Sequence, residues 1–370
     1  MNFLQLAKST AKFLLSVTLI RKALEIVSVI KCKFFSLTSK LSAFYYFLLS
    51  NAFNREMKGV LAGQLQFQKR LSKPNFTNPR LRRNIHRLEK GLIMPNKRAV
   101  FAMDYIGETL EAFENSVEIK QQKIDKLEIQ WAYDVLKSYF NHLQNNNVEN
   151  LKVKKFIGQF QEIEKKYILT SDYLATKSSL KIPYSNRPEN PVRYEDLLKL
   201  SIRRRSVRFY KPEIPPRYLI DKAIEIANYS PSACNRQPFE FRIFDSPDLV
   251  KKIANIPFGT SGYADNIPCI IVIVGDLSSY FSPRDRHVIY IDGSLAAMSF
   301  MLALETLGLS SCPINWPDFG FLEKKMKKSL SLKDYERPVM LISVGFADQD
   351  KLVPYSQKKD ISLIRNYNKL

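Results

Sequence analysis

The sequence predicts a mixed domain of helices and a few buried strands, about 175 residues long, that follows a helical region. Two short apolar runs rich in β-branched residues, 270–275 and 339–345, are typical of buried strands. Between them, residues 291–307 are apolar at helical spacing, and Gly308 follows as a typical helix-ending residue. Helices mixed with a few core strands indicate an α/β or an α+β domain.

Length and composition limit the class of protein further. At roughly 100–200 residues per domain, a chain of 370 residues predicts two domains, and 45% hydrophobic content excludes global disorder. The four cysteines (32, 234, 269 and 312) form no C-x-x-C pair, which excludes a disulfide scaffold and a zinc finger. With three histidines in the chain, we expect no His-rich metal site.

The net charge of +21 is concentrated at the N-terminus. Residues 1–100 carry 19 basic and 3 acidic side chains, whereas residues 101–200 sum to −1 and residues 201–370 to +6. This basic excess raises nucleic-acid binding as an alternative function. The sequence contains no recognisable nucleic-acid-binding motif, so we do not expect nucleic acid as a partner.

Residues 1–50 are rich in Leu, Phe, Ile and Val, but a basic residue interrupts them every few positions. These basic residues leave no uninterrupted window of 18 apolar residues, which disfavours a membrane-spanning helix. The segment also lacks a cleavage site of small residues, which disfavours a signal peptide. The pattern predicts a series of basic amphipathic helices. These helices either pack on their own protein or lie on an anionic membrane surface as interfacial helices.

Helical patterns continue through the first half of the chain. Residues 80–91 predict a helix with Gly91 as its C-cap, and residues 101–168 predict further helices with a loop at 144–150. The arginines of 80–91 either form a solvated basic face or hold a phosphate or an acidic partner. Three prolines and several turn-forming residues mark 178–194 as a linker. We therefore expect a basic helical extension at 1–177 and a second domain at 195–370.

Four segments of the second domain carry polar and basic side chains suited to binding a cofactor. They are IRRRSVRFY at 202–210, SPSACNRQPF at 230–239, DGSLAA at 292–297 with LGLSSCPINW at 307–316, and VGFA at 344–347 with QKKDI at 357–361. In this order and at these distances they resemble the motifs of the nitroreductase family of FMN-dependent oxidoreductases. The resemblance covers about residues 195–370.

The resemblance implies an α+β flavin fold, with a central, mainly antiparallel sheet flanked by helices. It also implies a homodimer with FMN between the subunits. The minimal family domain lacks the all-helical region at 1–177. Longer chains with a segment like 83–91 before the flavin domain look like a bacterial subgroup linked to surface polysaccharide production.

The first segment has the chemistry that a phosphate requires. Arginine forks bind phosphate through two hydrogen bonds, and a hydroxyl adds a neutral one, so Arg204, Ser206 and Arg208 supply a suitable set within five residues. By resemblance, Arg204, Arg205 and Ser206 reach the phosphate and the ribityl hydroxyls. Lys358 or Lys359 would complete this phosphate clamp from near the C-terminus.

The second segment suits the edge of a planar ring, because amide side chains offer both donors and acceptors. In an extended loop Asn235 and Gln237 would point the same way, and the loop would be stiffened by Pro231 and Pro238. By resemblance, Ser232 belongs to the same motif. The resemblance also places Pro313, Ile314 and Asn315 on or beside the isoalloxazine ring.

Three features depart from the family pattern or extend it. Cys234 stands where small or hydroxyl residues are common, and we expect a small buried side chain there. Trp316 would narrow or line the substrate pocket. The stretch 279–287 is either an ordinary charged loop or a loop at the substrate mouth, where Arg284, Arg286 and His287 would favour an anionic substrate or a nicotinamide phosphate.

The resemblance implies the chemistry. NADH or NADPH would reduce FMN, and a nitroaromatic, a quinone or another small acceptor would then take the electrons in the same pocket, by a ping-pong mechanism. The flavin carries this reaction, so we expect no separate catalytic acid or base. The alternative is a membrane-associated flavin-binding or scaffold protein linked to surface polysaccharide production. The expected location is the cytoplasm, with peripheral contact at the inner face of the membrane.

Overall fold

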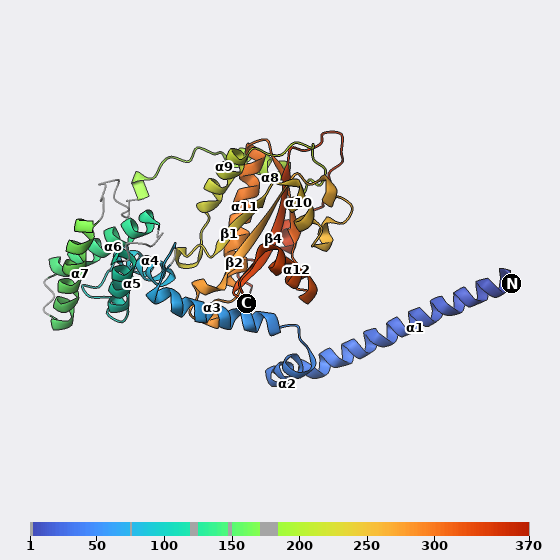
Figure 1. Ribbon diagram of the computed structural model, residues 1–370, viewed down its shortest axis with the longest axis horizontal. Helices are drawn as coiled ribbons and strands as arrows, with labels where there is room; N and C mark the ends of the chain where they lie inside the picture. The colour runs from blue at the N-terminus through green and yellow to red at the C-terminus, as the bar shows by residue number, and fades with distance from the viewer. Residues whose placement is uncertain (1–2, 75, 119–124, 147–149, 171–183, 370) are drawn as a thin grey trace. The chain divides into compact units, whose positions relative to one another are not determined.

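The computed structural model describes residues 3–74, 76–118, 125–146, 150–170 and 184–369 (Figure 1). Contacts divide the chain into two compact units, Met1–Lys58 and Gly59–Leu370. The expected linker at 178–194 falls partly outside the described residues. Its described part contains a short 3₁₀ turn, Tyr184–Asn186, and ends where helix α8 begins. The expected boundaries at 177 and 195 stay predictions.

The first unit is helical, as the sequence predicts. It contains α1 (Phe3–Phe35), α2 (Ser39–Phe44) and a π-helical turn, Tyr45–Leu49. The Thr38 hydroxyl accepts a hydrogen bond from the backbone N–H of Leu41 at 3.2 Å and caps the start of α2. Aromatic rings pack at the end of the unit, with the centroids of Tyr46 and Phe53 4.5 Å apart.

Helix α3 (Asn54–Ser72) begins in the first unit and continues into the second. The helices that follow enclose a core of their own, and within the described residues these are α4 (Pro79–Leu92), α5 (Ile106–Glu118), α6 (Lys126–Asn145) and α7 (Leu151–Thr170). Asn78 caps α4 through its side chain, and Pro79 stands at the first helical position, where its missing N–H is not needed. The apolar positions of α4 that the sequence shows at helical spacing, Leu81, Ile85 and Leu88, are all fully buried.

The prediction that Gly91 ends this helix is wrong. Helix α4 continues to Leu92, and its C-cap is Ile93. A Cβ atom at position 91 would lie 2.3 Å from the ring of Phe101, so only glycine allows the ring this close. Close packing, and not helix termination, explains this glycine.

The sheet of the second unit has four strands, β1 (Phe239–Phe244), β2 (Cys269–Asp276), β3 (Ser310–Asn315) and β4 (Glu336–Gly345). They pair in the order β1-β2-β4-β3, and each of these pairs is antiparallel. Seven successive residues of β2, 269–275, are buried, as expected for a central strand covered on both faces. The predicted strands at 270–275 and 339–345 and the predicted antiparallel sheet are confirmed.

Helices cover both faces of the sheet (Figure 1). Helices α9 (Arg217–Asn228) and α11 (Val288–Thr306) share a core with alternate residues of β2, such as Ile271 and Ile273. Helices α10 (Pro247–Ala254) and α12 (Gly320–Leu330) share the other core with Ile270 and Val272. The short helix α8 (Tyr194–Arg203) precedes this arrangement. Gly308 follows α11 with φ of 77°, which confirms the predicted helix end.

Helix α11 lies within the one described stretch that is long and apolar enough to cross a membrane, Pro283–Thr306. Half of its apolar window is buried. Ala296, Phe300 and Leu304, four residues apart, are fully buried in the core that α11 shares with the sheet. The hydrophobicity of α11 is therefore explained by its position as the central helix of the domain.

Candidate cofactor site

The first predicted segment lies at one end of the sheet, beside the start of β3. Ser206 forms an isolated parallel bridge with Ser311, and the backbone N–H of Val207 donates to the Ser311 carbonyl at 3.1 Å. Ser311 in turn pairs with Val344 of β4. The fold thus brings the arginine-rich segment next to β3, which carries Pro313, Ile314 and Asn315.

Arg204 is the residue of this segment whose surroundings fit an anion. Its Nη1 atom is buried and has no hydrogen-bond partner among the described residues. Burial raises the pKa of the nearby Glu305 carboxyl, while Arg203 and Arg204 lower it. Because a buried guanidinium nitrogen without an acceptor is unfavourable, an anionic ligand at this atom would stabilise the arrangement.

The arginines of the segment diverge. Arg204 lies near Glu305, at the C-terminal end of α11. Arg208 donates to the Ser206 carbonyl at 3.3 Å, and its guanidinium lies 6.0 Å from the ring centroid of Tyr263, in the core on the α10 and α12 face. Arg205 and Ser206 are both half-buried. Arg204 is consequently the better placed of the two forks predicted for the phosphate.

The β3 segment presents a mixed surface. Ile314 is buried, Pro313 is half-buried and Asn315 is exposed. Trp316, which directly follows, donates its indole N–H to the Glu323 carboxylate at 2.6 Å. Trp316 is therefore held against the start of α12, where its ring lies partly buried against that core.

The second predicted segment forms a tight turn, so the prediction of an extended loop is wrong. Cys234, Asn235 and Gln237 have φ of 55°, 51° and 49°, in the left-handed region. This conformation costs roughly 1–2 kcal/mol for each non-glycine residue, so surrounding contacts must hold it. One such contact is the backbone N–H of Ala233, which donates to the Asp292 carboxylate at 3.0 Å.

Cys234 is half-buried, which corrects the expectation of a buried side chain. Its sulfur lies 3.8 Å from Nη2 of Arg236, a buried arginine that also pairs with Asp285 at 3.3 Å. In the same loop Ser232 accepts from the backbone N–H of Gln237 at 3.1 Å, and Pro231 is exposed. The turn places a thiol beside a guanidinium at its tip.

The side chain of Gln237 is already engaged. Its amide nitrogen donates to the side-chain oxygen of Asn228 at 2.6 Å, and its oxygen accepts from Arg82 at 3.0 Å. The carbonyl of Asn235 accepts from the same Arg82 at 2.7 Å, which leaves the Asn235 side-chain amide as the more accessible flavin contact. Arg82 belongs to α4, and its pairing with Glu128 at 3.0 Å agrees with the acidic partner expected as one alternative for the arginines of this helix. Its contact with the turn could not be predicted, because Asn235 and Gln237 lie about 150 positions further along the chain.

A single chain does not bring the two principal motifs together. The second segment contacts Asp292 near the N-terminal end of α11, whereas Arg204 lies by Glu305 near its C-terminal end. The 13 residues between them correspond to about 20 Å along a helix at 1.5 Å per residue. The sheet agrees with this separation. The Pro238 carbonyl accepts from the backbone N–H of Asp276 at the last residue of β2, whereas Ser206 bridges to Ser311, which is level with Cys269, the first residue of β2.

The remaining predicted residues are exposed. Lys358 and Lys359 lie on a C-terminal segment, 351–360, that has no regular secondary structure. Arg284 pairs with Asp285 at 3.8 Å, and its guanidinium lies 5.1 Å from the ring centroid of Phe281. His287 is the N-cap residue of α11. The structure brings none of these four described side chains into contact with Arg204 in the interactions it records.

Reasoning from the sequence also missed an aromatic cluster beside β3. The rings of Phe258, Phe319 and Phe321 lie 5.8–5.9 Å apart between centroids, and all three side chains are about half exposed. Gly259 connects this cluster to the site, because a Cβ there would lie 3.2 Å from Ile314. Phe258 lies about 60 positions before Phe319 and Phe321, so no local pattern identifies the three as one cluster.

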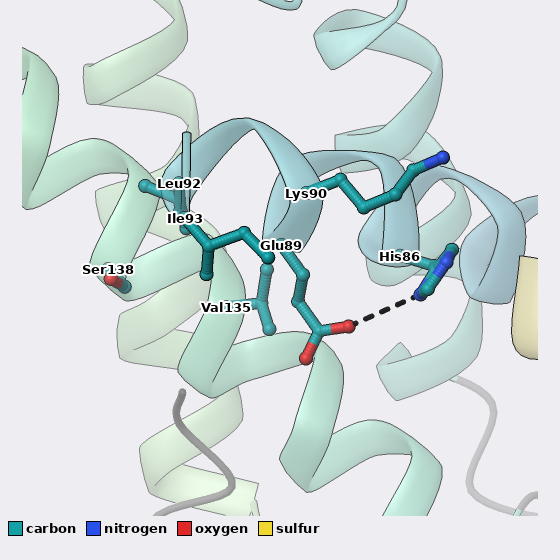
Figure 2. Close-up of a pocket in the computed structure, with 7 residues that line it drawn as sticks. All are labelled: His86, Glu89, Lys90, Leu92, Ile93, Val135 and Ser138. Carbon is teal, nitrogen blue, oxygen red and sulfur yellow. Dashed lines mark ion pairs between the residues drawn. The ribbon is translucent and has the colours of Figure 1, made fainter. Parts of the chain in front are cut away.

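A separate cavity of about 230 Å³ lies in the helical part of this unit (Figure 2). Glu89 accepts from the indole N–H of Trp131 at 2.8 Å and pairs with His86 at 3.6 Å. The lining side chains come from α4, from its C-cap residue and from α6: His86, Glu89, Lys90, Leu92, Ile93, Val135 and Ser138. None of them belongs to the predicted cofactor site.

The chain therefore carries a buried arginine fork without an acceptor among the described residues, a constrained amide-bearing turn and a mixed apolar strand, with the fork and the turn at opposite ends of α11. This set of groups has the chemistry that the phosphate, the ring edge and the ring face of FMN require. An antiparallel α+β domain that carries such a set is typical of flavin-dependent oxidoreductases.

Comparison with known proteins names the family. The model of the nitroreductase family matches residues 202–261 and 257–346, so this region of the chain is similar to that family. The mouse iodotyrosine deiodinase 1 is 23% identical over 288 residues, covering 68% of this chain and 92% of that protein. The iodotyrosine deiodinase of Thermotoga neapolitana is 26% identical over 179 residues, covering 42% and 90%.

Other similar proteins carry nitroreductase names. The Bacillus subtilis protein YdgI, whose name assigns it as an NAD(P)H nitroreductase, is 24% identical over 202 residues, covering 44% of this chain and 94% of that protein. Among solved structures, an FMN-dependent nitroreductase of Clostridium difficile R20291 is 24% identical with a TM-score of 0.41, covering 47% of this chain and 99% of that one. The solved nitroreductase chain matches less than half of this one while being covered almost completely, so it is shorter than this chain.

Proposed function

We propose that this protein is an FMN-dependent oxidoreductase that takes hydride from NADH or NADPH and passes electrons to a small acceptor by a ping-pong mechanism. The observation that carries the proposal is the buried Nη1 atom of Arg204, which has no acceptor among the described residues, within a region that matches the nitroreductase family. Structural arginines are normally satisfied by a carboxylate or a carbonyl, so this one fits an anionic ligand.

The chain's own residues would bind and orient the cofactor. Arg204 and Ser206 would hold the phosphate, with Arg205 at the ribityl hydroxyls, whereas Arg208 is directed toward Tyr263. Asn235 and Gln237 would meet the ring edge, while Pro313, Ile314 and Asn315 would lie against its face. Bound FMN supplies the hydride and electron chemistry, so the protein contributes position, charge and exclusion of water.

We infer that the active form is a homodimer. The two motifs lie at opposite ends of α11, so a second copy related by a two-fold axis would bring the Arg204 end of one chain to the 232–237 turn of the other. An exposed apolar stripe supports this arrangement, since Ile291, Leu295 and Met298 on one face of α11 are 56%, 43% and 42% exposed. Lys358 and Lys359, on the exposed C-terminal segment, would close the phosphate site after assembly.

The acceptor is proposed to be a planar aromatic molecule, such as a nitroaromatic or a quinone. The cluster of Phe258, Phe319 and Phe321 beside Ile314 offers partly exposed rings for stacking. Trp316 would line the same pocket, and Arg284 and His287 would favour an anionic donor or substrate at its mouth. Because several relatives are iodotyrosine deiodinases, an iodinated tyrosine belongs in the set of acceptors to be assayed.

One spectroscopic experiment tests the enzyme proposal. The full chain is purified with added FMN, its visible spectrum is recorded, and NADH or NADPH is added without oxygen. Flavin absorption that bleaches with a donor and returns with a nitroaromatic or a quinone supports the proposal. Colourless protein, or flavin that stays oxidised with both donors, would overturn it.

A second proposal concerns the first unit, for which we infer contact with an anionic membrane surface. Residues 1–58 carry nine basic and two acidic side chains. Apolar side chains of α1 such as Leu19, Leu24 and Val27 are 60–65% exposed. Apolar side chains interspersed with lysines favour the boundary between anionic headgroups and acyl chains.

Vesicle flotation tests this second proposal. The full chain should float with vesicles that contain phosphatidylglycerol and much less with pure phosphatidylcholine. The double variant Lys22→Glu/Lys33→Glu should lose most of the difference, because each cation near such a surface contributes about 1 kcal/mol. Equal flotation of the wild type with both lipids would contradict the proposal.

A further inference from the structure

Arg82 of α4, in the helical extension, donates hydrogen bonds to the 232–237 turn. Its three guanidinium nitrogens have three different acceptors. Nε donates to the Asn235 carbonyl at 2.7 Å, Nη2 donates to the Gln237 side-chain oxygen at 3.0 Å, and Nη1 donates to Glu128 at 3.0 Å. The guanidinium spreads its donors over three nitrogens in one plane, whereas a lysine ammonium has its three donors on a single nitrogen and could not keep all three of these contacts.

Arg82 is itself held rigidly from the opposite side. The Glu128 side chain is 1% exposed and also accepts from the Thr77 hydroxyl at 2.6 Å and from the backbone N–H of Asn78 at 2.8 Å. The Arg82 guanidinium also lies 5.5 Å from the ring centroid of Trp131. Contacts within the helical extension therefore fix the position of Arg82 independently of its contacts with the turn.

The turn needs such support. Asn235 and Gln237 are two of its three residues with left-handed backbone, and both receive a hydrogen bond from Arg82. Non-glycine residues keep this conformation only where surrounding contacts over-determine it. Asp292 and Ser232 accept from backbone N–H groups of the turn, and Asn228 accepts from the Gln237 amide nitrogen, so none of these contacts engages the Asn235 carbonyl or the Gln237 amide oxygen.

We propose that Arg82 is a positioning residue of the flavin site, through which the helical extension sets the geometry of the 232–237 turn and hence the affinity for FMN. This inference rests on the proposed function, because it assigns that turn to the flavin ring. On this proposal the helical extension contributes a positioning residue to the site, although Arg82 lies more than 100 residues before the region that matches the family.

The proposal is tested with Arg82→Lys in the full chain. Lysine keeps a charge beside Glu128, so the buried carboxylate stays paired, but it cannot reach all three acceptors. We expect the Kd for FMN, measured by quenching of flavin fluorescence, to rise at least fivefold. The visible circular dichroism of the bound flavin should change, and amide exchange at 233–238 in the FMN-free protein should become faster.

A matched control separates the loss of the Arg82 contacts from a general weakening of the packing between the helical extension and the sheet domain. Arg70 of α3 also crosses to the sheet domain, where it pairs with Asp276 at 2.8 Å, but it does not touch the turn. Arg70→Ala should leave FMN affinity and exchange at 233–238 within twofold of wild type. A second variant, Arg82→Gln with Glu128→Gln, removes both charges together and should reproduce the effect of Arg82→Lys if the fork is what matters.

The outcomes are distinguishable. If the wild type binds FMN and both Arg82 variants bind it equally well with unchanged exchange, the positioning role is wrong and the proposed function stands. If Arg70→Ala weakens FMN binding as much as Arg82→Lys, the effect is general and the positioning role is also wrong. If the wild type binds no FMN, the proposed function fails, and the assignment of the turn to the flavin fails with it.

Discussion

The hydroxyl oxygens of Tyr210 and Ser343 lie 2.8 Å apart in the core of the sheet domain. The Tyr210 hydroxyl also donates to the Val207 carbonyl at 2.6 Å, so one buried side chain joins the arginine-rich segment to the central strand β4. Burial raises the pKa of the Tyr210 phenol well above its usual value, which keeps it protonated at physiological pH. Tyr210 therefore fixes the position of the residues proposed to bind phosphate.

Replacing Tyr210 with phenylalanine should weaken both the fold and the site. Loss of the hydroxyl leaves the Val207 carbonyl and the Ser343 hydroxyl short of a buried partner, which costs about 1–3 kcal/mol. Urea unfolding should show a reduced free energy of unfolding, and FMN titration should show weaker binding. Unchanged values in both measurements would mean that the segment is held by its backbone bridge to Ser311 alone.

Replacing Arg204 with alanine should remove most of the affinity for FMN. Two charge-assisted hydrogen bonds to phosphate contribute roughly 1.5–3 kcal/mol each, so their loss corresponds to a factor of at least one hundred in Kd. The control is Arg217→Ala, which removes an exposed arginine paired with Asp245 on the surface. Full retention of FMN by the Arg204 variant would place the phosphate elsewhere.

Glu305 gives the apoprotein a predictable dependence on pH. Burial raises the pKa of its carboxyl above the ordinary value of 4.5, so the folded state holds the proton more tightly than the unfolded state. The protonated Glu305 carboxyl therefore stabilises the folded state in full below pH 4.5, and this stabilisation is lost as the pH rises through the raised pKa of the folded state. Glu305→Gln should remove this loss. The free energy of unfolding of the variant, measured with urea, should therefore rise relative to that of the wild type between pH 4.5 and 7. A constant difference across that range would contradict the assignment.

The proposed dimer makes a paired prediction of assembly and cofactor binding. An aspartate in place of Leu295 would place a charge in the centre of the apolar stripe on α11, where desolvation should weaken association by at least 2 kcal/mol, about thirtyfold in Kd. Sedimentation should then show monomers, and FMN should be lost with the dimer. Leu249→Asp changes an equally exposed apolar residue on α10 and should alter neither property.

The regular elements of the sheet domain could be predicted because their signals are local. The buried runs at 269–276 and 336–345 and the apolar helix 288–306 are each recognisable within one window of sequence. The residues of the candidate site could be named for the same reason, since each motif is a short segment. The arrangement of these motifs in space could not be predicted from the sequence, because it depends on tertiary structure. Helix α11 separates the motifs of one chain, so that they lie at opposite ends of the sheet.

The backbone of the cofactor turn could not be predicted for a different reason. Nothing in the local sequence around Cys234 and Asn235 requires positive φ, since neither is glycine. Their conformation is set by Arg82 and Asp292, which lie about 150 positions before and about 60 positions after them. The prediction that Gly91 ends a helix failed for a similar reason. The glycine is required by packing against the Phe101 ring, which the sequence preferences of helix C-termini do not take into account.

Gly91 in α4 and Gly158 in α7 allow a matched test of that correction. Alanine favours a helix over glycine by about 1 kcal/mol, so a Gly→Ala change in open space should stabilise the protein. At Gly158 a Cβ would meet nothing within 4 Å, and Gly158→Ala should raise the free energy of unfolding. At Gly91 the Cβ would lie 2.3 Å from the Phe101 ring, and overpacking of about 1–3 kcal/mol should outweigh the gain. Urea unfolding of both variants should therefore give changes of opposite sign. If Gly91→Ala were as stabilising as Gly158→Ala, the contact with Phe101 would not be the reason for glycine at that position.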